Sequence, residues 1–397
     1  MKKQLLRWGA IGVLAGLIAL STMVAYADGT VPGYVLVRTQ PGVSIQQLAS
    51  DYGATVLDHV SGTDIYSLSL PQGDDEATFA GSLGGDARVA YSETDTFVTT
   101  PILHGDPFHF SFDGGPNPGT YVNQHAYRQV NAGRANLLTT GVGVTVAVLD
   151  TGVTFGHKAL KNHLLPGYNA LDPTQPPNDI PDGTTNVATG HGTMIAGIIA
   201  WMAPRAKILP VRVLNGDGVG TILSVSKGLE YAIAHGVKVI NLSFGTTVKT
   251  SALNDILDNA ESAGIAVVVA AGNDGENLVS YPAAGRGVIG VAAVEANNVK
   301  SPYSNYGSFV RVVAPGSGIR STFWDGGFAS WSGTSFAAPF VAAEAALLFA
   351  YRPNLTVSDV RGAIRASSRS VDLQNPAYKG KLGNGIINVL SALRHVR

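Results

Sequence analysis

The sequence contains no cysteine, and it also lacks the features that mark several other classes of protein. Without cysteine the chain cannot form disulfides, iron–sulfur clusters, thiolate zinc sites or a cysteine nucleophile. Its basic residues are scattered, with no run of five, so nucleic-acid binding is not expected. No internal repeat, low-complexity tract or heptad pattern is visible.

Glycine, by contrast, is abundant: 48 of 397 residues, about 12% against a usual value of about 7%. A chain of this kind has many tight turns and close backbone approaches. Because 45% of the residues are hydrophobic and 14% are charged, the composition is that of a folded protein. The length suits one large domain together with a small one.

The first 27 residues have the three parts of a secretory signal peptide. MKKQLLR is basic, WGAIGVLAGLIALSTMV is apolar, and Ala25-Tyr26-Ala27 is a small-x-small cleavage site. This predicts cleavage after Ala27 and a secreted, extracellular protein. The alternative is an uncleaved membrane anchor, because the apolar stretch nearly reaches spanning length.

Residues 28–100 form an acidic module, with ten acidic and two basic residues, whereas residues 101–397 carry 18 acidic and 22 basic ones. This difference in charge has two interpretations: the acidic module docks on the mildly basic remainder of the chain, or the two modules differ in net charge by chance. Strand patterns lie at 34–38, 55–60, 64–70 and 87–98, and helix patterns at 44–54 and 74–84. The order β-α-β-β-α-β predicts a small ferredoxin-like module.

A linker is predicted at 101–120, where eight residues are glycine or proline. Beyond it the pattern changes to buried strands separated by helices, and this domain is predicted to span 121–397. Its strands are expected at 144–149, 206–214, 237–243, 265–271 and 288–294. Continuous β-branched strands of this type predict an α/β fold, with a parallel sheet covered by helices on both faces.

Polar motifs fall at the carboxyl ends of these strands, where parallel α/β sheets carry their sites. Asp150 ends the first strand in DTG, Asn273 follows a later one in AAGN, and His191 opens a helix in GHGT. In GTSFAAP, Ser335 should begin a buried helix with Pro339 in its first turn. Each motif alone could be a turn or a helix cap, but the order Asp, His, Ser is that of a subtilisin triad.

Taken together, DTG, GHGT, AAGN and GTSFAAP resemble the motifs of the subtilisin-like serine proteases, or subtilases. VRVLNGDGVG, INLSFG, YPA and GNGIINVLSAL also look like segments of that family. The resemblance covers roughly residues 120–397, and the 28–100 module looks like the family's propeptide. It implies a secreted serine endopeptidase with a subtilisin-like fold, made as a self-processing zymogen that acts on proteins and peptides.

The same resemblance implies a role for each motif. Ser335 would be the nucleophile, His191 its base and Asp150 the residue that orients His191. Asn273 would donate its side-chain amide to the oxyanion beside the backbone N–H of Ser335. The propeptide would help folding and inhibit the enzyme, with its last strand, near residues 97–100, lying in the substrate cleft. The mature chain, expected as a monomer, would begin at about residue 99–110.

Glycine-rich edges are expected to hold a substrate as an added β-strand. These are Gly218, Val219 and Gly220 on one side and Ser243, Phe244 and Gly245 on the other. By resemblance, the first specificity pocket is bordered by Ala270, Gly272 and Ser280, and an outer pocket is lined by Ile222, Val225 and Phe244. No acidic cluster occurs there, which favours a broad, apolar specificity; the alternative is that these residues only pack the core.

No cofactor is required for this chemistry, but structural calcium is compatible with the resemblance. The weak candidate ligands are Asp172, Asp179 and Asp182, and a solvated loop is the alternative. The loop in IAWMAPRAKILPV is too short for the tight calcium site that many subtilases carry there. A different class of function, a secreted binding protein on an inactive protease fold, is disfavoured because all four motif residues are present.

Overall fold

The computed structural model describes residues 29–100 and 119–397. The predicted signal peptide and residues 101–118 of the predicted linker lie outside the described residues. Helix α4 (Gly119–Val122) already contains the last two residues of that linker, so the first helix of the large domain begins earlier than expected.

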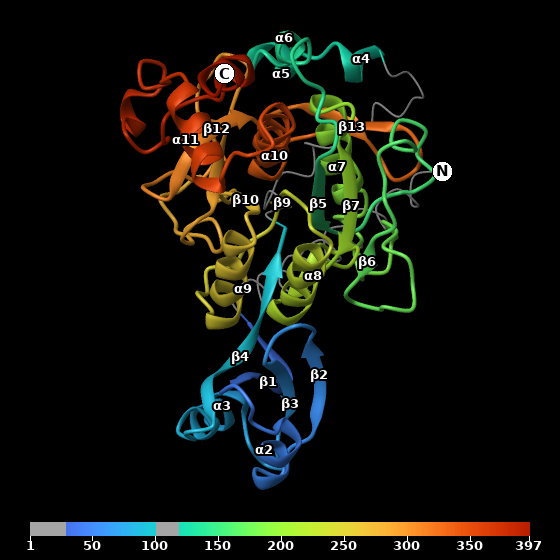
Figure 1. The fold of residues 1–397 in the computed structure, drawn as a ribbon, viewed down its shortest axis with the longest axis vertical. Coiled ribbons are helices and arrows are strands. Elements are labelled where there is room, and N and C mark those ends of the chain that lie inside the picture. Colours follow the sequence, from blue (N-terminus) through green and yellow to red (C-terminus); the bar gives the residue numbers. More distant parts are fainter. Residues whose placement is uncertain (1–28, 101–118) are drawn as a thin grey trace, which may run out of the picture.

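The acidic module is a small antiparallel sheet carrying two helices (Figure 1). Its strand order is β2-β3-β1-β4, and its own core contains Val35, Val37, Leu48, Phe79 and Leu83. In chain order the elements are β1 (Thr30–Thr39), α2 (Ile45–Asp51), β2 (Val56–Val60), β3 (Ile65–Ser69), α3 (Glu76–Gly84) and β4 (Val89–Thr99). Ser44 and Asp75 cap the two helices with their side chains, which explains why both begin where they do.

The large domain is built on a seven-stranded sheet of order β12-β11-β10-β9-β5-β7-β6, in which every pairing is parallel. The strands are β5 (Thr145–Asp150), β6 (Tyr168–Asn169), β7 (Lys207–Arg212), β9 (Val239–Leu242), β10 (Ala266–Ala270), β11 (Ile289–Val294) and β12 (Val310–Pro315). The longer helices are α7 (His191–Met202), α8 (Ile222–Ala234), α9 (Ser251–Ser262), α10 (Thr334–Tyr351) and α11 (Val357–Ser367). The remaining described elements are short. They are the helices α5 (His125–Gln129), α6 (Ala132–Ala135), η1 (Pro376–Tyr378) and α12 (Val389–His395), the strand β8 (Val219–Thr221), and the hairpin of β13 (Ile319–Thr322) and β14 (Phe328–Trp331).

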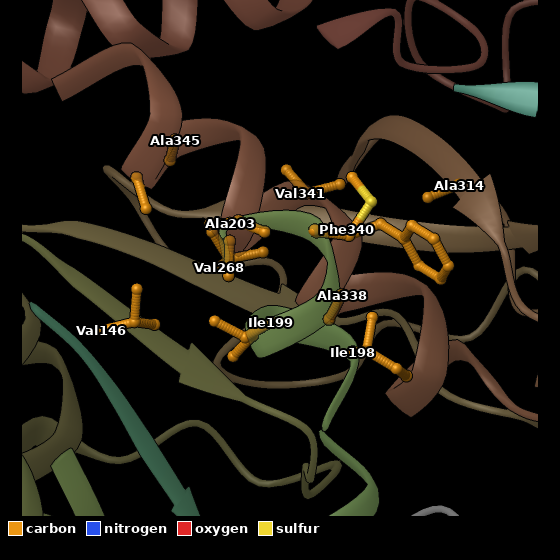
Figure 2. Close-up of a cluster of buried hydrophobic side chains, with 14 of the residues drawn as sticks. Val146, Ile198, Ile199, Ala203, Val268, Ala314, Ala338, Phe340, Val341 and Ala345 are labelled. Carbon is orange, nitrogen blue, oxygen red and sulfur yellow. The ribbon is translucent and has the colours of Figure 1, made fainter. Parts of the chain in front are cut away.

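Helices cover both faces of the sheet, as predicted. Val146 and Val148 of β5 face a core that includes α7 and α10, while Ala147 and Leu149 face a second core that includes α8 and α9. Figure 2 shows the first core, with Ile198 and Ile199 of α7 beside Ala338 and Phe340 of α10. Because side chains alternate along a strand, a central strand buried on both faces must be apolar throughout.

Helix α10 is the element of the described chain that is long and apolar enough to cross a membrane, and it is 89% buried inside the protein. It packs on α7 and on strands β9 to β12. Its composition is therefore explained by its place in the core.

The sequence interpretation missed the two outermost strands of the large sheet. Strand β6 has only two residues, which is too short for a periodic signal. Strand β12 carries the half-buried Arg311 near its start, and this charge interrupts its apolar run. Edge strands tolerate such residues because one side of the strand is unpaired.

Candidate active site

Strand β5 and helix α7 bring an acid and an imidazole together. Strand β5 ends at Asp150 and α7 begins at His191, and Nδ1 of His191 lies 2.8 Å from Oδ1 of Asp150. Both side chains are buried. The backbone N–H of Thr151 also donates to Oδ1 of Asp150 (2.8 Å), which holds the carboxylate in place. With Nδ1 turned to the acid, Nε2 is the ring nitrogen left for proton transfer.

Two aromatic rings hold the imidazole from the side. The His191 ring lies 5.7 Å from that of Trp331 and 5.3 Å from that of Phe336, both in edge-on geometry. Sequence reasoning missed both residues. Their positions near Ser335 could have indicated this role, since Trp331 lies four residues before it and Phe336 one residue after it.

Ser335 is the second residue of α10, and the helix begins one residue earlier than predicted, after Gly333. Its hydroxyl donates to the backbone carbonyl of Ser243 at 3.0 Å. Ser243 in turn donates its own hydroxyl to the backbone carbonyl of Ser335 (2.9 Å), and Asn241 donates to that hydroxyl (2.9 Å). All three residues are buried, so the helix start is tied to the end of β9 by a closed set of hydrogen bonds.

The prediction that Pro339 lies in the first turn of α10 is wrong, because the helix starts at Thr334 and Pro339 lies inside it. A residue at this position would normally donate its N–H to the carbonyl four residues earlier, which is that of Ser335. Proline has no N–H to give. The hydroxyl of Ser243 replaces this donor, so the carbonyl of Ser335 remains satisfied although the helix contains a proline.

Asn273 lies just past β10, where the sequence predicted it. Its side-chain oxygen accepts from the backbone N–H of Thr334 and from the hydroxyl of Thr334, both at 2.9 Å. The same hydroxyl accepts from the N–H of Gly272 (3.1 Å). Because both donors of Thr334 engage the oxygen, the amide orientation is fixed and the NH₂ end is directed away from Thr334.

The two predicted substrate edges hold strand β4 of the acidic module, which projects from that module into the large domain (Figure 1). Phe97 to Thr99 pair antiparallel with β8, so β8 becomes the fifth strand of the module's sheet. On the other side, Thr99 and Gly245 exchange two backbone hydrogen bonds, of 3.0 and 2.9 Å. The N–H of Thr100 donates to the carbonyl of Gly218 (2.9 Å).

Glycine is needed at position 218 for two reasons. Its φ is +77°, which side-chain-bearing residues rarely adopt, and a Cβ there would collide with the side chain of Thr100. The edge can therefore approach a bound strand this closely only because it lacks a side chain.

Several residues predicted to line the pockets lie beside the two edges that hold this strand. Val98 is fully buried in one apolar cluster with Ile222, Val225 and Phe244, the predicted outer pocket. On the other edge, the Ser280 hydroxyl lies so near Gly245 that a Cβ on this glycine would meet it at 2.5 Å. Ala270 and Gly272 are buried at the end of β10.

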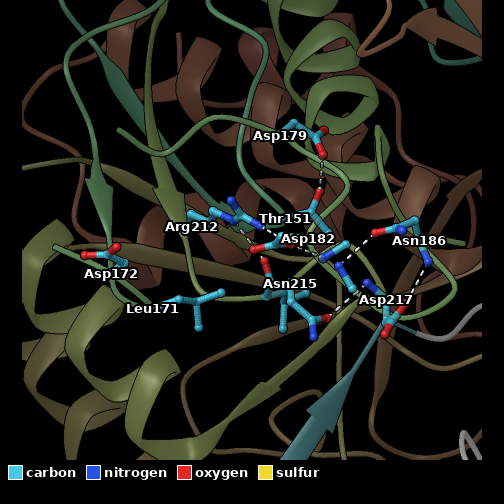
Figure 3. A network of polar contacts seen from close by, with 12 residues as sticks. Thr151, Leu171, Asp172, Asp179, Asp182, Asn186, Arg212, Asn215 and Asp217 are labelled. Atoms are coloured by element: carbon cyan, nitrogen blue, oxygen red, sulfur yellow. Dashed lines mark hydrogen bonds and ion pairs between the residues drawn. The ribbon is translucent and has the colours of Figure 1, made fainter. Parts of the chain in front are cut away.

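The three carboxylates suggested as calcium ligands do not converge (Figure 3). Exposed Asp172 closes its own turn by accepting from the N–H and the hydroxyl of Thr174. Asp182 accepts from the N–H of Gly216 and forms an ion pair of 2.5 Å with the buried Arg212. In the described part of the chain, no group of three or more His, Asp or Glu side chains could hold a metal ion.

Asp179, the third of these residues, caps the start of α7 instead. It accepts from the N–H of Gly190 (2.9 Å), from the N–H and hydroxyl of Thr193 (3.1 and 2.7 Å) and from the hydroxyl of Thr151 (3.1 Å). Burial raises the pKa of Asp179 to about 6, although these bonds act in the opposite direction. The carboxylate thus ties the residue after Asp150 to the helix that carries His191.

Two further carboxylates, missed in the sequence, join the acidic module to the large domain. Glu93 of β4 accepts from the backbone N–H groups of Ser251 and Ala252 at the start of α9 (2.7 and 2.9 Å). Asp95 accepts from the N–H of Leu223 at the start of α8 (3.3 Å) and from the Tyr34 hydroxyl (2.8 Å). Burial raises the pKa of both, that of Asp95 to about 6.

These contacts give the charge asymmetry of the chain a structural basis. The negative module presents carboxylates to the positive ends of two helix dipoles. Lys227 adds an ion pair with Asp58 at 2.8 Å, whereas Arg38 and Asp255 form one of the opposite polarity.

Comparison with known proteins identifies a family and individual relatives that this chain is similar to. The model of the subtilase family matches residues 141–385. Thermitase from Thermoactinomyces vulgaris is 39% identical over 258 residues, which are 62% of this chain and 89% of thermitase. Subtilisin BL from Lederbergia lenta is 36% identical over 264 residues, which are 64% of this chain and 92% of that protein.

Among solved structures, that of fervidolysin from Fervidobacterium pennivorans is similar, with a TM-score of 0.76 at 22% identity. That protein is described as a keratinolytic enzyme related to subtilisin. The match covers 92% of this chain and 61% of fervidolysin, so the chain spans about three fifths of its length. At this identity the likeness supports the fold alone.

Proposed function

Because the chain belongs to the subtilase family and is a subtilisin-like serine endopeptidase, we propose that it is a secreted zymogen whose catalytic triad is Asp150, His191 and Ser335. The observation that carries the proposal is the position of β4, held between β8 and Gly245 as a peptide substrate would be. A strand from the chain's own acidic module in that place would block the substrate edges, which is why we propose that the module inhibits the enzyme. Subtilases need no cofactor for catalysis, so the described side chains are sufficient for the chemistry.

In the proposed reaction, the Ser335 hydroxyl turns from the Ser243 carbonyl toward Nε2 of His191 and attacks the scissile carbonyl carbon. His191 takes the hydroxyl proton, and Asp150 stabilises the resulting imidazolium. The carbonyl oxygen becomes an oxyanion that accepts from the Asn273 amide and from the backbone N–H of Ser335. His191 then gives its proton to the leaving amine, and water releases the acyl group by the same steps.

The acidic module acts as the enzyme's own inhibitor in this proposal. Residues 28–100 would be removed by a cut beyond Thr100, and the signal at 1–27 would direct the chain out of the cell as a monomer. Fully buried Val98 supports a broad apolar specificity, since it belongs to the same apolar cluster as Ile222, Val225 and Phe244. Acidic or basic side chains at this substrate position would be desolvated without a partner.

The assignment of the nucleophile is tested with a fluorophosphonate probe on purified wild-type protein. The probe reacts only with an activated serine, so the label is expected on the peptide that contains Ser335. Mass spectrometry of the digested protein locates it. A chain freed of residues 28–100 that still takes no label would instead support a binding protein on an inactive protease fold.

The docking of the module makes a second prediction. Glu93→Ala and Asp95→Ala remove the acceptor oxygens that cap the starts of α9 and α8, so each should lower the unfolding midpoint of the uncleaved chain. The expected loss is about 1–2 kcal/mol for each cap, or about 1–3 °C in a chain of this length. Thermal unfolding followed by circular dichroism in the Ser335→Ala background, where no cleavage intervenes, measures it.

Asp58→Ala is the matched control, because it removes an acid of the same module from a partly exposed ion pair with Lys227. Such pairs contribute at most about 1 kcal/mol. Equal shifts for all three variants would mean that net charge, and not capping, stabilises the docked state.

A further inference from the structure

An arginine-lined pocket lies at the opposite edge of the sheet from the candidate active site. It encloses about 460 Å³ and is lined by Arg311 of β12 and by Arg361 and Arg365 of α11, beside the backbone of 287–289. Ile289 and Arg311 lie at the amino ends of their strands, whereas Asp150 and Asn273 lie at or just beyond carboxyl ends. In a parallel sheet these are different edges, so the pocket is separate from the proteolytic chemistry.

Neutral groups hold the three guanidinium groups in place. Arg361 donates from Nη1 to the carbonyl of Gly287 (2.5 Å), Arg365 from Nε to Oδ1 of Asn384 (3.1 Å), and Arg311 from Nη1 to the carbonyl of Ser308 (3.1 Å). Carbonyl and amide oxygens orient a guanidinium without cancelling its charge. Each arginine has five N–H donors, so donors remain on all three.

The charge of the pocket is only partly compensated. Glu261 pairs with Arg361 at 2.6 Å, and the residues that line the pocket include no acid. Within residues 29–100 and 119–397, Arg311 and Arg365 have no ion pair. Two cations without an ion pair therefore line one polar depression, and an anion placed between them would be attracted to both.

The first turn of α11 forms one side of the pocket. Ser358, the second residue of this eleven-residue helix, is a lining residue. The Asp359 carboxylate in the same turn accepts from the N–H and hydroxyl of Thr356 and offsets the positive end of the helix dipole, so the positive charge of the pocket comes from its arginines. Gly287 and Gly362 are also lining residues, and their lack of side chains leaves the depression open.

We propose that this pocket binds a small dianionic oxyanion of the phosphate and sulfate class, which joins α11 to β12. A guanidinium group can donate two parallel N–H bonds to two oxygens of such an anion. Chloride has no pair of acceptor oxygens, so this geometry favours the oxyanion over chloride. The bound anion would stabilise the packing of α11 on the sheet. The inference does not depend on the proposed function, because no residue of the triad takes part.

The test uses the full-length Ser335→Ala chain, which cannot digest itself. Its unfolding midpoint is measured in about 20 mM sodium phosphate, in about 20 mM sodium sulfate, and in sodium chloride of equal ionic strength and pH. For millimolar affinity, both oxyanions should raise the midpoint by about 2–5 °C beyond chloride. Calorimetric titration of phosphate into the same chain gives the affinity directly.

Arg311→Gln with Arg365→Gln should abolish this increment and the calorimetric signal, while the single Arg365→Gln change should weaken both. Arg134→Gln, on the exposed surface of α6, is the matched control for charge and should keep the full increment. Equal increments in the double variant and the control would overturn the proposal, as would equal midpoints in phosphate and in chloride.

Discussion

The Ser335→Ala chain is expected to keep the acidic module after secretion, whereas the wild-type chain loses it. Without the hydroxyl there is no acyl-enzyme, and peptidase activity should fall about a million-fold, the loss that this change causes in subtilisin. The remaining rate enhancement over water would come from binding and from the oxyanion donors, the Asn273 amide and the N–H of Ser335. The variant should fold, since the hydroxyl makes one hydrogen bond, to the Ser243 carbonyl.

Intact mass and N-terminal sequencing of both purified proteins measure this prediction. The wild-type chain should begin beyond Thr100. Its first residue would identify the peptide bond that is cleaved in the segment after β4. The Ser335→Ala chain should begin at or near Asp28 if the signal is removed. Mixing the two proteins shows whether wild-type enzyme can cut the variant in trans.

Ser330→Ala is the matched control, because it removes a hydroxyl five residues away on β14 and should leave processing unchanged. If Ser335→Ala lost the acidic module at the wild-type rate when expressed alone, another protease would be responsible. Self-processing would then be excluded even if Ser335 proved to be the nucleophile for peptides.

The sequence located Asp150, His191 and Asn273 correctly relative to strand and helix ends, because parallel strands bring their carboxyl ends to one edge. The sequence could not show where α10 begins relative to Pro339. Pro339 suggested a first-turn position, but the hydroxyl of Ser243, 92 residues away in the sequence, satisfies the carbonyl that the proline leaves free. Such compensation depends on tertiary contact and has no local signal.

The carboxylates were the least predictable part. Asp179 and Asp182 are plausible hard-ion ligands by residue type, yet the fold supplies N–H, hydroxyl and guanidinium partners to them. Glu93 and Asp95 looked like ordinary strand residues, and their role appears only when β4 meets the first turns of two helices. The partners of a carboxylate depend on which segments the fold brings next to it. Neither the amino-acid composition nor the hydrophobic periodicity of the sequence contains that information.

Glu344, in the middle of α10, should make the protein less stable as the pH rises. Its side chain is fully buried, and both carboxyl oxygens lack a hydrogen-bond partner among the described residues. Its neighbours on the helix, Phe340, Val341, Leu347 and Leu348, are buried and apolar. Burial raises the pKa of Glu344 from about 4.5 to about 8, so the carboxyl is protonated at neutral pH.

The sign follows from proton binding. Between about pH 4.5 and 8 the folded chain holds a proton on Glu344 that the unfolded chain has released, so the free energy of unfolding falls as the pH rises through this window. Above about pH 8 both states are ionised and the loss is complete. It amounts to on the order of 5 kcal/mol, or roughly 5–7 °C in the unfolding midpoint.

Glu344→Met keeps the length of the side chain and removes the carboxyl, so it should raise the midpoint at every pH and most at pH 9. Glu344→Gln cannot ionise but still buries a polar group; it should equal the parent near pH 5 and exceed it at pH 9. Midpoints of the three chains at pH 5, 7 and 9, in the Ser335→Ala background, measure the effect. If the parent and both variants lost stability in parallel between pH 5 and 9, other groups would control the alkaline limit. If both variants exceed the parent by several degrees more at pH 9 than at pH 5, with Met above Gln throughout, the alkaline limit is set by a single buried acid in the helix that presents Ser335.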